Sequence, residues 1–596
     1  MIENSIQQEF LKGFKEIFDV DIDIEQVKIQ QTRKEIVGDY TLNVFPFVRF
    51  ARKSPEETAG LMGEFLVAHV EYLTSFDVIK GFLNLVVSDL YWLNQFEKAN
   101  TDLNYGITAV DETKEPIVIE YSSPNTNKPL HLGHIRNNLL GFSIAEILKA
   151  NGENVKKVNL VNDRGIHICK SMLAWQKWGG GETPESTGTK GDNLVGKYYV
   201  KFDQEYKVEI KELVAQGMEE DEAKKQAPLI LEAQQMLRDW EAKKPEIYNL
   251  WETMNSWVYK GFDVTYKRLG VNFDKIYYES DTYLLGKEIV MKGLKEGVLY
   301  QSENGAVWAD LTDDGLDQKL LLRADGTSVY MTQDIGTAHL RQEDYNPQSM
   351  MYVVGNEQNY HFDVLKIILR KLGFAWSENI THISYGMVEL PEGKMKSREG
   401  TVVDADDLID EMVVTAKKTT TELGKVDDFS EEEAEQLFYN IGMGALKYFL
   451  LKVDPKKKMM FNPKESIDFN GNTGPFIQYT HARIQSVVRK SEGAEFVTKG
   501  QSPYTGELNE KERFLMNFLG TFPDVVNQAA DAYSPAVIAV YAYELAKEYN
   551  SFYHDNYIIN EADSSRALYR LELSKLTAKV IANSMKLLGI TVPERM

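Results

Sequence analysis

The chain has 596 residues, 43% of them hydrophobic, and its 67 basic against 90 acidic residues give a formal net charge of −23. This composition is typical of a soluble globular protein, and the length predicts about four domains of roughly 150 residues each. The negative charge argues against a general nucleic-acid coat protein, which needs clustered Lys and Arg side chains. The single cysteine, Cys169, excludes an internal disulfide and a Cys-rich zinc site.

The first residues lack the basic start and apolar core of a secretion signal. No run of about 18 apolar residues predicts a membrane span. We therefore expect a cytoplasmic protein with no membrane partner.

Residues 1–108 predict a small α+β domain. Apolar residues recur at helical spacing from Ile6 to Phe18, and strand-like stretches follow at 40–48 and 82–87. Residues 108–114 are mostly polar or acidic and predict a linker to the next domain.

Two later stretches each predict a strand, a helix and a second strand. In the first, an apolar strand at 116–121 is followed by a helical pattern at 135–148, which Gly152 ends, and by a strand at 155–161. The second has a strand at 350–354, a helix at 361–372 and a strand at 380–385. Parallel strands joined by right-handed crossovers predict a Rossmann-like, doubly wound α/β sheet.

Two regions predict helices without strands. Residues 179–260 are first Gly-rich and then charged and helix-favouring, which indicates a helical insertion into the α/β domain. From about residue 416, long amphipathic helices predict an α-helical bundle. We therefore divide the chain into residues 1–108, 109–415 and 416–596.

Residues 122–134 lie between the first predicted strand and its helix, at the carboxyl end of the sheet, where open α/β sheets bind ligands. His131 and His134 are three residues apart and project to the same side, while Gly133 leaves room for a ligand against the backbone. The helix N-terminus favours a phosphate. This pattern indicates a nucleotide-phosphate site, although an isolated pair of this kind is about as often two ordinary helix-start residues with a packing glycine.

A glycine-bounded loop at residues 391–400 follows the second strand–helix–strand unit and carries Lys394, Lys396 and Arg398. Cations on such a loop can stabilise the charge that develops on a departing pyrophosphate. Taken alone, these residues are more often solvated surface.

The two histidines and the Lys-Met-Lys-Ser loop, in this order, resemble the two signature motifs of class I aminoacyl-tRNA synthetases. Residues 120–136, 321–335, 354–362, 474–484 and 593–596 are similar to the arginyl-tRNA synthetase family, and the resemblance spans nearly the whole chain. It implies a ligase that attaches L-arginine to its tRNA through an arginyl-adenylate and releases AMP and pyrophosphate. It also implies that ATP carries Mg²⁺ into the site, and we expect no zinc.

The resemblance assigns residues to three sites. Arginine would be bound by Glu120, Ser123, Asn125, Tyr330, Asp334 and Gln358. ATP would be bound by Lys128, His131, Gly133, His134, Lys394 and Lys396, of which His131, His134 and Lys394 would be catalytic. The N-terminal domain would bind the tRNA elbow through Phe82 and Asn84, and the bundle would bind the anticodon through Tyr479, Ala482, Arg483 and Met596. We expect a monomer whose partners are tRNA, arginine and ATP.

The chemistry of the substrate fits this assignment, because a guanidinium is a planar, permanently charged fork that carboxylates bind best. Asp334 and Glu120 would supply the anions. Without the resemblance, Asp334 is more simply a helix cap and Glu120 a surface residue of a strand.

The sequence departs from the family in two places. The class-wide loop reads Lys-Met-Ser-Lys-Ser, so the second lysine of this chain, Lys396, falls one position early, and Lys128 is a candidate to reach the phosphates instead. Arg164 stands where many relatives have Trp.

Two other functions are alternatives. One is a different nucleotidyl-transferring synthetase, either another tRNA synthetase or a small adenylating ligase that shares the two-histidine loop; the small ligase has no need of the long C-terminal helical region. A noncatalytic tRNA-binding relative has no need of both histidines and Lys394. As a further hypothesis from the family, formation of the adenylate is expected to require bound tRNA.

Overall fold

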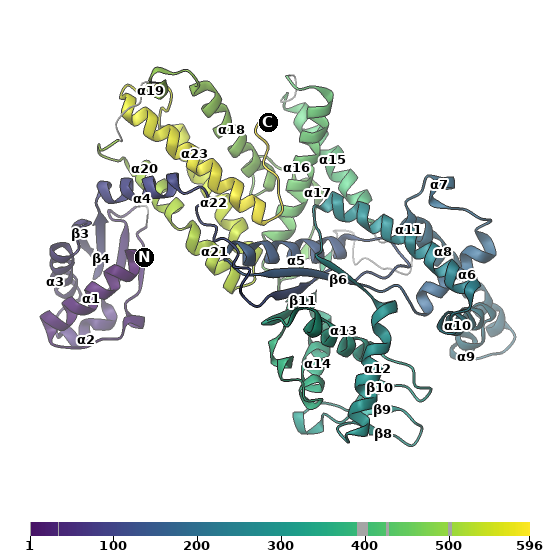
Figure 1. The fold of residues 1–596 in the computed structure, drawn as a ribbon. Coiled ribbons are helices and arrows are strands. Elements are labelled where there is room, and N and C mark those ends of the chain that lie inside the picture. Colours follow the sequence, from purple (N-terminus) through teal and green to yellow (C-terminus); the bar gives the residue numbers. More distant parts are fainter. Residues whose placement is uncertain (1, 34, 390–402, 425–427, 499–503) are drawn as a thin grey trace. The chain divides into compact units, whose positions relative to one another are not determined.

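The computed structural model describes residues 2–33, 35–389, 403–424, 428–498 and 504–596 (Figure 1). The chain forms two compact units, each discontinuous in sequence. Unit 1 comprises Met1–Tyr105, Val487–Thr521 and Glu548–Thr577, and unit 2 comprises Gly106–Ser486, Phe522–Lys547 and Ala578–Met596. The domain boundaries at residues 108 and 415 stay predictions.

Unit 1 begins with an antiparallel sheet of strand order β1-β2-β4-β3 and the helices packed beside it. Its elements are α1 (Ile2–Phe18), the 3₁₀ helix η1 (Ile24–Gln26), β1 (Ile29–Gln31), β2 (Tyr40–Asn43), the 3₁₀ helix η2 (Phe45–Phe47), α2 (Val48–Ala51), α3 (Pro55–His69), β3 (Leu73–Ile79), β4 (Phe82–Val87) and α4 (Asp89–Thr101). The α1 helix buries Ile6, Phe10 and Phe14, as its spacing predicts. The strand predicted at 40–48 ends early, because Pro46 has no N–H for a ladder and lies within η2 instead.

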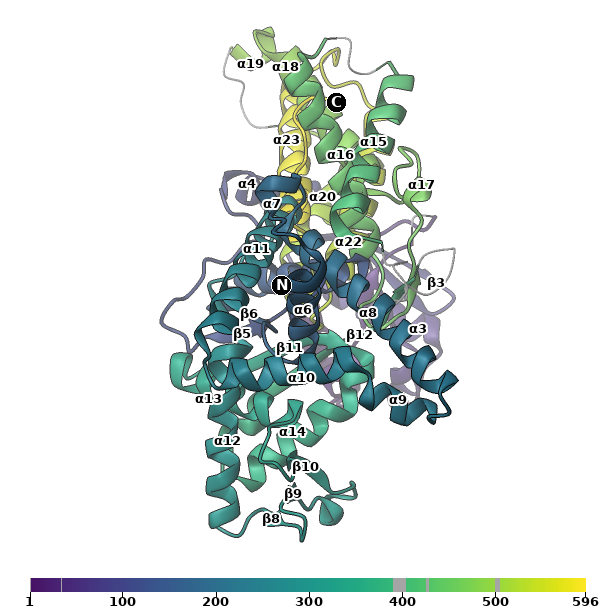
Figure 2. The same cartoon turned by 90° about the vertical axis from the view of Figure 1, so that its right-hand side faces the viewer.

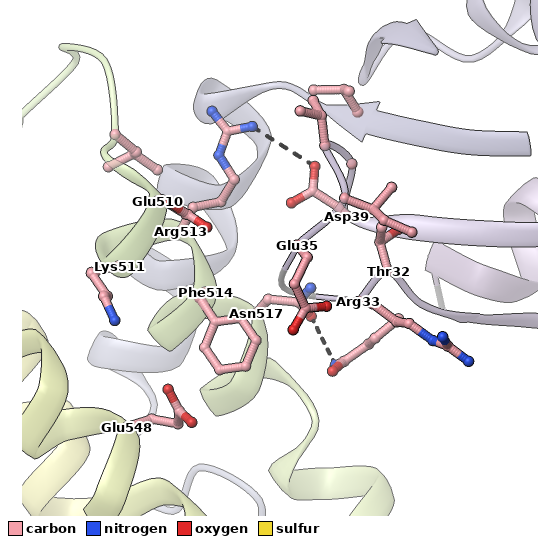
Figure 3. A pocket seen from close by; sticks show the side chains of 16 residues that line it. Thr32, Arg33, Glu35, Asp39, Glu510, Lys511, Arg513, Phe514, Asn517 and Glu548 are labelled. Atoms are coloured by element: carbon pink, nitrogen blue, oxygen red, sulfur yellow. Dashed lines mark hydrogen bonds and ion pairs between the residues drawn. The ribbon is translucent and has the colours of Figure 1, made fainter. Parts of the chain in front are cut away.

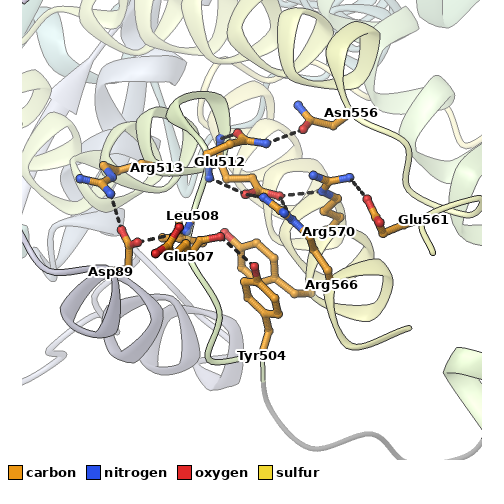
Figure 4. A network of polar contacts seen from close by, with 12 residues as sticks. Asp89, Tyr504, Glu507, Leu508, Glu512, Arg513, Asn556, Glu561, Arg566 and Arg570 are labelled. Atoms are coloured by element: carbon orange, nitrogen blue, oxygen red, sulfur yellow. Dashed lines mark hydrogen bonds and ion pairs between the residues drawn. The ribbon is translucent and has the colours of Figure 1, made fainter. Parts of the chain in front are cut away.

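A buried ion cluster stabilises the C-terminal part of unit 1 (Figure 4). Glu512, on α20 (Glu510–Gly520), accepts hydrogen bonds from Arg566 Nη2 at 2.7 Å and Arg570 Nε at 2.6 Å. Burial alone would raise the pKa of Glu512, but the two guanidinium groups outweigh it and the pKa is lowered. The cluster ties α20 to α23 (Ser564–Leu587).

Unit 2 contains a five-stranded sheet of order β12-β11-β5-β6-β7, in which all neighbouring strands are parallel. The strands are β5 (Ile117–Glu120), β6 (Val155–Val161), β7 (Lys275–Tyr278), β11 (Ser349–Gly355) and β12 (Ile380–Tyr385), with α5 (Leu132–Ala150) and α14 (Asn359–Lys371) as crossovers. This confirms the predicted Rossmann-like, doubly wound fold. The chain reverses its winding direction between β5 and β11, and a doubly wound sheet forms its ligand crevice at that point.

Helices fill the predicted insertion, as Figure 2 shows. They are α7 (Pro184–Thr187), α8 (Gly191–Ala215), α9 (Glu220–Gln226), α10 (Pro228–Glu241) and most of α11 (Pro245–Leu269), while α6 (Ile166–Trp178) directly precedes the predicted insertion. The segment after β7 contains elements that the sequence analysis did not predict. They are α12 (Glu279–Lys295), β8 (Tyr300–Gln301), β9 (Val307–Ala309), η3 (Thr312–Asp314), β10 (Lys319–Leu322) and α13 (Tyr330–Tyr345), and β8 to β10 form a small antiparallel sheet.

The C-terminal third is helical, as predicted. Its helices are α15 (Ala405–Glu422), α16 (Glu431–Leu451), α17 (Pro463–Ser466), α18 (Gly474–Ser491), α19 (Glu495–Thr498), α20, α21 (Phe522–Asp531), α22 (Pro535–Asp555) and α23. The 3₁₀ helices η4 (Asn356–Gln358) and η5 (Ala375–Asn379) lie before β12, and a short parallel pair, β13 (Val388–Glu389) with β14 (Met459–Met460), follows it.

Candidate active site

The turn after β5 is fixed by one side chain of the crossover helix. Ser122 has a left-handed backbone with φ +66°, and its N–H donates to Asn137 Oδ1 at 2.6 Å. The Asn137 Nδ2 atom donates to the carbonyl of Val353 in β11 at 2.7 Å. Asn137 therefore joins the ends of β5 and β11 and fixes the crevice where the sheet reverses.

The two histidines start α5 as a mutual cap. His131 Nδ1 accepts from the N–H of Gly133 and His134 Nδ1 accepts from the N–H of His131, both at 3.2 Å. The ring centroids are 3.9 Å apart. A Cβ at Gly133 would be 3.1 Å from the His131 ring, so the glycine gives that ring its place.

Both imidazoles are neutral at physiological pH. Burial, with Lys128 nearby, lowers the pKa of His131 to about 4. Burial and the neighbouring His131 lower the pKa of His134 well below its ordinary value. Because each Nδ1 accepts a hydrogen bond, each ring carries its hydrogen on Nε2. The pair therefore presents two Nε2–H donors.

A cavity of about 210 Å³ borders the histidine loop. Lys128 and His131 line it together with residues of α8 and with Asp404. Burial lowers the pKa of Lys128. Asp404 caps α15, and the next residue, Ala405, donates its N–H to the carbonyl of Leu130 at 2.9 Å. Lys394, Lys396 and Arg398 lie outside the described residues.

Arg136, two residues after His134, is completely buried. Its guanidinium donates to the carbonyls of Met387 at 3.2 Å, Pro455 at 3.3 Å and Lys457 at 3.0 Å. These carbonyls precede β13 and β14. Arg136 thus joins the histidine helix to this strand pair, and burial lowers its pKa to about 10.

Glu120, the last residue of β5, is buried in an ion pair with Arg341 of α13. Its other oxygen accepts from Ser123 Oγ at 2.9 Å. The Arg341 guanidinium also lies over the rings of Tyr277 and Tyr352, at 5.1 and 5.2 Å. Two of the predicted arginine-binding residues, Glu120 and Ser123, are therefore in direct contact.

Asp334 projects from the first turns of α13 and is half-buried. Its Oδ2 atom is 2.5 Å from His361 Nε2 on α14. Tyr330, one helical turn earlier, is 75% exposed, and Gln358 and Asn125 are also exposed.

The charges of Glu120 and Asp334 both affect the pKa of the Tyr352 side chain. The pKa of Tyr352 is raised to about 12, chiefly by burial, with Arg341 lowering it and the charges of Glu120 and Asp334 raising it. Tyr352 pairs with Glu120 in the register of β11 and β5. Both predicted carboxylates are thus close to the carboxyl edge of the sheet.

Glu279 is a third carboxylate at this edge and was missed by the sequence analysis. It starts α12 directly after β7, and its Oε1 accepts from Gln333 Nε2 at 2.7 Å. Burial raises its pKa to about 7, with Arg164 lowering it and the charges of Asp163 and Asp334 raising it. Glu279 follows β7 directly, whereas Glu120 is the last residue of β5, so both lie at the carboxyl edge of the parallel sheet.

Arg164 joins the insertion to α12. Its guanidinium lies 3.8 Å from the ring centroid of Tyr283 and 5.2 Å from that of Trp240. It also pairs with Glu241 at 2.8 Å. Stacking between aromatic rings is a role that a Trp side chain could also fill at this position.

The residues predicted to bind the anticodon lie on α18 and the C-terminal tail. Arg483 lies over the ring of Tyr479 at 5.0 Å. The tail is held to this helix, because Gln478 donates to the carbonyl of Thr591 at 2.8 Å and the His481 ring contacts the carbonyl of Pro593 at 3.0 Å. These contacts hold Thr591 and Pro593 to α18, and Ala482 of that helix is buried.

The residues predicted to bind the tRNA elbow differ in exposure. Phe82 is 37% exposed, but Asn84 is only 1% exposed and its Oδ1 accepts from Thr41 Oγ1 at 2.7 Å. Asn84 therefore lies inside the sheet.

Unit 1 also contains a cavity of about 430 Å³ between the 31–39 segment and α20 (Figure 3). It carries both signs of charge, and its Arg513 and Asp39 are 3.8 Å apart. No residue predicted for a site lines it.

Across the described ranges, no group of three or more His, Cys, Asp or Glu side chains is placed to hold a metal ion. In the same part of the chain, no helix has the length and apolar character to cross a membrane.

Three family models match the chain. Residues 100–462 match "tRNA synthetases class I (R), catalytic domain", residues 477–596 match "DALR anticodon binding domain", and residues 2–87 match "Arginyl tRNA synthetase N terminal domain". Together these models cover most of the sequence.

Several similar proteins are arginine–tRNA ligases that match over their whole length. The chain is 58% identical to an arginine–tRNA ligase of Bacteroides fragilis, with 100% of both chains covered, and 56% identical to that of Flavobacterium psychrophilum, with 97% of both covered. Among solved structures, the arginyl-tRNA synthetase of Thermus thermophilus has a TM-score of 0.75 at 22% identity, with 100% of both chains covered. That of Plasmodium falciparum has a TM-score of 0.73 at 20% identity, covering 100% of this chain and 99% of the other. These two structures share the fold.

Proposed function

The chain belongs to the class I arginyl-tRNA synthetase family, whose members ligate arginine to tRNA with ATP, and we propose that the crevice between β5 and β11 is its reaction site. In the first step a carboxylate oxygen of arginine attacks the α-phosphorus of ATP, and the bond from that phosphorus to the pyrophosphate oxygen breaks. In the second step a hydroxyl of the terminal tRNA ribose attacks the arginyl carbonyl, and AMP leaves. Neither step needs a covalent bond to the enzyme.

The guanidinium of the substrate is proposed to bind between Asp334 and Glu279. The buried carboxyl of Glu279 holds its proton up to about pH 7. When the permanently charged guanidinium enters, Glu279 can lose this proton and form an ion pair with it. Asp334 is half-buried and contacts the His361 ring. Tyr330, Gln358 and Asn125 are exposed around the same crevice and complete the proposed pocket.

Glu120 and Ser123 are proposed to bind the α-ammonium end of the substrate. The charge of Glu120 is already balanced by Arg341, so its remaining role is to accept hydrogen bonds and to orient Ser123. This keeps the arginine carboxylate at the end of β5, next to the histidine loop.

ATP is proposed to lie along the start of α5. The two Nε2–H donors of His131 and His134 would bind the α-phosphate and its bridging oxygen, where charge develops in the transition state. Gly133 would allow close approach, and Lys128 with Lys394 and Lys396 would bind the outer phosphates, accompanied by Mg²⁺ carried by ATP. Catalysis then rests on positioning and on charge stabilisation.

The elbow of the tRNA is proposed to bind the N-terminal residues. The anticodon is proposed to bind α18 and the C-terminal tail. Phe82 and Asn84 are the proposed elbow residues, while Tyr479, Ala482, Arg483 and Met596 are the proposed anticodon residues. We further propose a cytoplasmic monomer in which bound tRNA is needed for adenylate formation.

The observation that carries the specificity is that two carboxylates lie at the carboxyl edge of the sheet, where Asp334 contacts His361 and Glu279 accepts from Gln333. The test is pyrophosphate exchange into ATP with each amino acid, with and without tRNA. Exchange should occur with arginine, and Asp334→Asn should raise the arginine KM roughly tenfold, since a charged hydrogen bond contributes about 1.5 to 3 kcal/mol.

The matched control is Asp363→Asn, which removes an exposed carboxylate from the neighbouring helix α14. Its arginine KM should stay at the wild-type value. Exchange with another amino acid would reject the proposed pocket, and no exchange under any condition would reject the proposed chemistry.

A further inference from the structure

A buried cluster of charged groups joins the helical insertion to the start of α15. At its centre is the buried carboxylate of Asp406. Its Oδ2 atom accepts hydrogen bonds from Lys190 Nζ at 2.6 Å and from Thr265 Oγ1 at 2.7 Å, and its Oδ1 atom accepts from Arg268 Nη1 at 2.8 Å. Lys190 directly precedes α8, and Thr265 and Arg268 lie in the last turns of α11. One carboxylate of α15 therefore connects three helices.

The charges of this cluster balance one another. Lys190 Nζ also donates to Asp192 Oδ2 at 2.8 Å, and Asp192 is completely buried. Burial alone would raise the pKa of Asp406, but its hydrogen bonds and the nearby cations outweigh burial and the pKa is lowered. Charge-assisted hydrogen bonds are stronger than neutral ones and have a narrower geometry, so the ionised carboxylate of Asp406 has one fixed position.

Two glycines allow the insertion helices to approach closely enough for this arrangement. A Cβ at Gly261 of α11 would be 2.3 Å from Asp192 Oδ1, and a Cβ at Gly191 of α8 would be 2.1 Å from the carbonyl of Trp257. Because both distances are too short for a real side chain, α8 and α11 meet at glycine. Their contact holds Lys190 next to α11, where its Nζ donates to Thr265 Oγ1 at 2.7 Å.

The backbone beside Asp406 holds the histidine loop. Asp404 and His131 pair as an antiparallel bridge, and the N–H of Ala405 donates to the carbonyl of Leu130 at 2.9 Å. The carboxylate of Asp404 accepts in turn from the N–H of Asp406 at 2.7 Å. Three consecutive residues therefore contact the insertion through one side chain and the histidine loop through their backbone.

We propose that Asp406 is a positioning residue for the histidine pair. Through Lys190 and Arg268 it fixes the start of α15 on the insertion, and the start of α15 fixes the backbone of His131. The role of the histidines as donors to the α-phosphate belongs to the proposed function, on which this inference rests. The insertion and the histidine loop then form one support for that phosphate, and Asp406 acts on the reaction without touching a substrate.

The test is the single-turnover rate of adenylate formation by the full-length protein at saturating arginine and ATP, with tRNA present. Asp406→Asn should lower this rate at least roughly tenfold, since misplacing a reacting group by about 1 Å can cost roughly 100-fold. The arginine dissociation constant should stay within about twofold of wild type, because the proposed arginine pocket lies on other elements. Asp407→Asn is the matched control. It removes the same charge from the same helical turn but from an exposed side chain, and its rate should equal that of wild type.

A double variant separates positioning from general damage to the fold. In a His131→Ala protein the ring that Asp406 positions is already absent. Adding Asp406→Asn to it should therefore lower the rate by less than about threefold. A purely structural effect would instead multiply with the effect of His131→Ala.

Thr265→Val decides the question if Asp406→Asn does not fold. Valine has nearly the shape of threonine, so this variant removes only the hydroxyl that contacts Lys190 and Asp406. Its rate should be at least roughly threefold lower, with unchanged arginine affinity.

Three results would each overturn the proposal. They are a wild-type rate in Asp406→Asn or Thr265→Val, an equal loss of rate and arginine affinity in either variant, and a fully multiplicative loss in the double variant. A wild-type protein that forms no arginyl-adenylate would instead overturn the proposed function.

Discussion

The carboxylate of Glu120 is paired with the guanidinium of Arg341, so the enzyme places an arginine of its own at the end of β5. Both groups are buried, and Arg341 also lies between two tyrosine rings. The attraction to Glu120 keeps the pKa of Arg341 above its ordinary value although burial opposes it. A carboxylate balanced in this way is no longer free to neutralise a second guanidinium, which is why we assign that task to Asp334 and Glu279.

Arg341→Met should lower stability by about 3 kcal/mol, because it leaves the Glu120 charge buried without a partner. The measurement is the urea midpoint of tryptophan fluorescence. The double variant Glu120→Gln with Arg341→Met should regain part of the loss. Arg370→Met removes a surface pair with Asp314 and serves as the control, with a cost below about 1 kcal/mol. Equal urea midpoints for Arg341→Met and Arg370→Met would show that the buried pair of Glu120 and Arg341 contributes no more than a surface pair.

Arginine binding should tighten as the pH rises through about 7. In the free enzyme burial raises the Glu279 pKa to about 7, and a bound guanidinium favours the ionised form, so binding releases a proton. The dissociation constant should fall roughly tenfold between about pH 6 and 8. Calorimetry in buffers of different ionisation enthalpy measures both the affinity and the proton released.

Glu279→Gln is the matched variant for this pH dependence. It should bind arginine more weakly than wild type at pH 8 and with little change from pH 6 to 8. The stability of the wild type gives an independent check, because the folded protein binds the Glu279 proton more tightly than the unfolded chain does. The stabilisation from this proton is present below the ordinary pKa of 4.5 and is lost as the pH rises through about 7. A wild-type affinity that is flat with pH would remove Glu279 from the pocket.

The adenylation rate at saturating arginine should not depend on histidine protonation. Because the pKa of His131 is about 4 and that of His134 is also lowered, the rate should be flat from about pH 5.5 to 7.5. His134→Ala should reduce it roughly 100-fold through loss of one donor to the transition state. Single-turnover formation of the adenylate measures this rate, with the exposed His69→Ala as control. A rate that changes with pH around a midpoint near 6.5 would contradict this expectation. A rise with pH would show that a charged imidazole is harmful, and a fall with pH would show that it is required.

The predictable part of the fold is the part with local signals. The strands β5 and β11 are buried on both faces, so their mostly apolar runs identify them without any structure. The strand β6 is also largely buried, although its sequence contains two lysines between apolar residues. The strand β7 is short and carries polar and aromatic residues with mixed burial, and no period separates it from a loop. Glu279 follows that strand and was missed for this reason.

Other features depend on contacts between distant segments. The pairing of Glu120 with Arg341 joins a strand to a helix far along the chain, and no spacing in the sequence indicates it. The sequence likewise does not indicate whether the side chain of Asn84 is buried or exposed. In β4 the residues Leu83, Asn84 and Leu85 are all buried, because this strand does not alternate between core and solvent. The resemblance to a family identifies such a residue but not its exposure.

Arg136→Lys should reduce the rate of adenylate formation more than it reduces the affinity for arginine. The guanidinium bridges three carbonyls from two segments, which a single ammonium on a different stem cannot reproduce, and an unsatisfied buried carbonyl costs about 1 to 3 kcal/mol. Since Arg136 lies two residues after His134, loosening it should displace the histidine donors rather than the arginine pocket. We expect at least a roughly tenfold lower single-turnover rate with an arginine dissociation constant within about twofold of wild type.

The control for this variant is Arg238→Lys on the exposed face of α10, which should leave both quantities unchanged. A circular dichroism melt separates a positioning effect from unfolding, because the rate is measured well below the midpoint of each variant. If arginine affinity and rate fall in the same proportion, Arg136 only stabilises the domain. If neither changes, the strand pair β13 and β14 is held without Arg136, and its contact with the histidine helix has no part in catalysis.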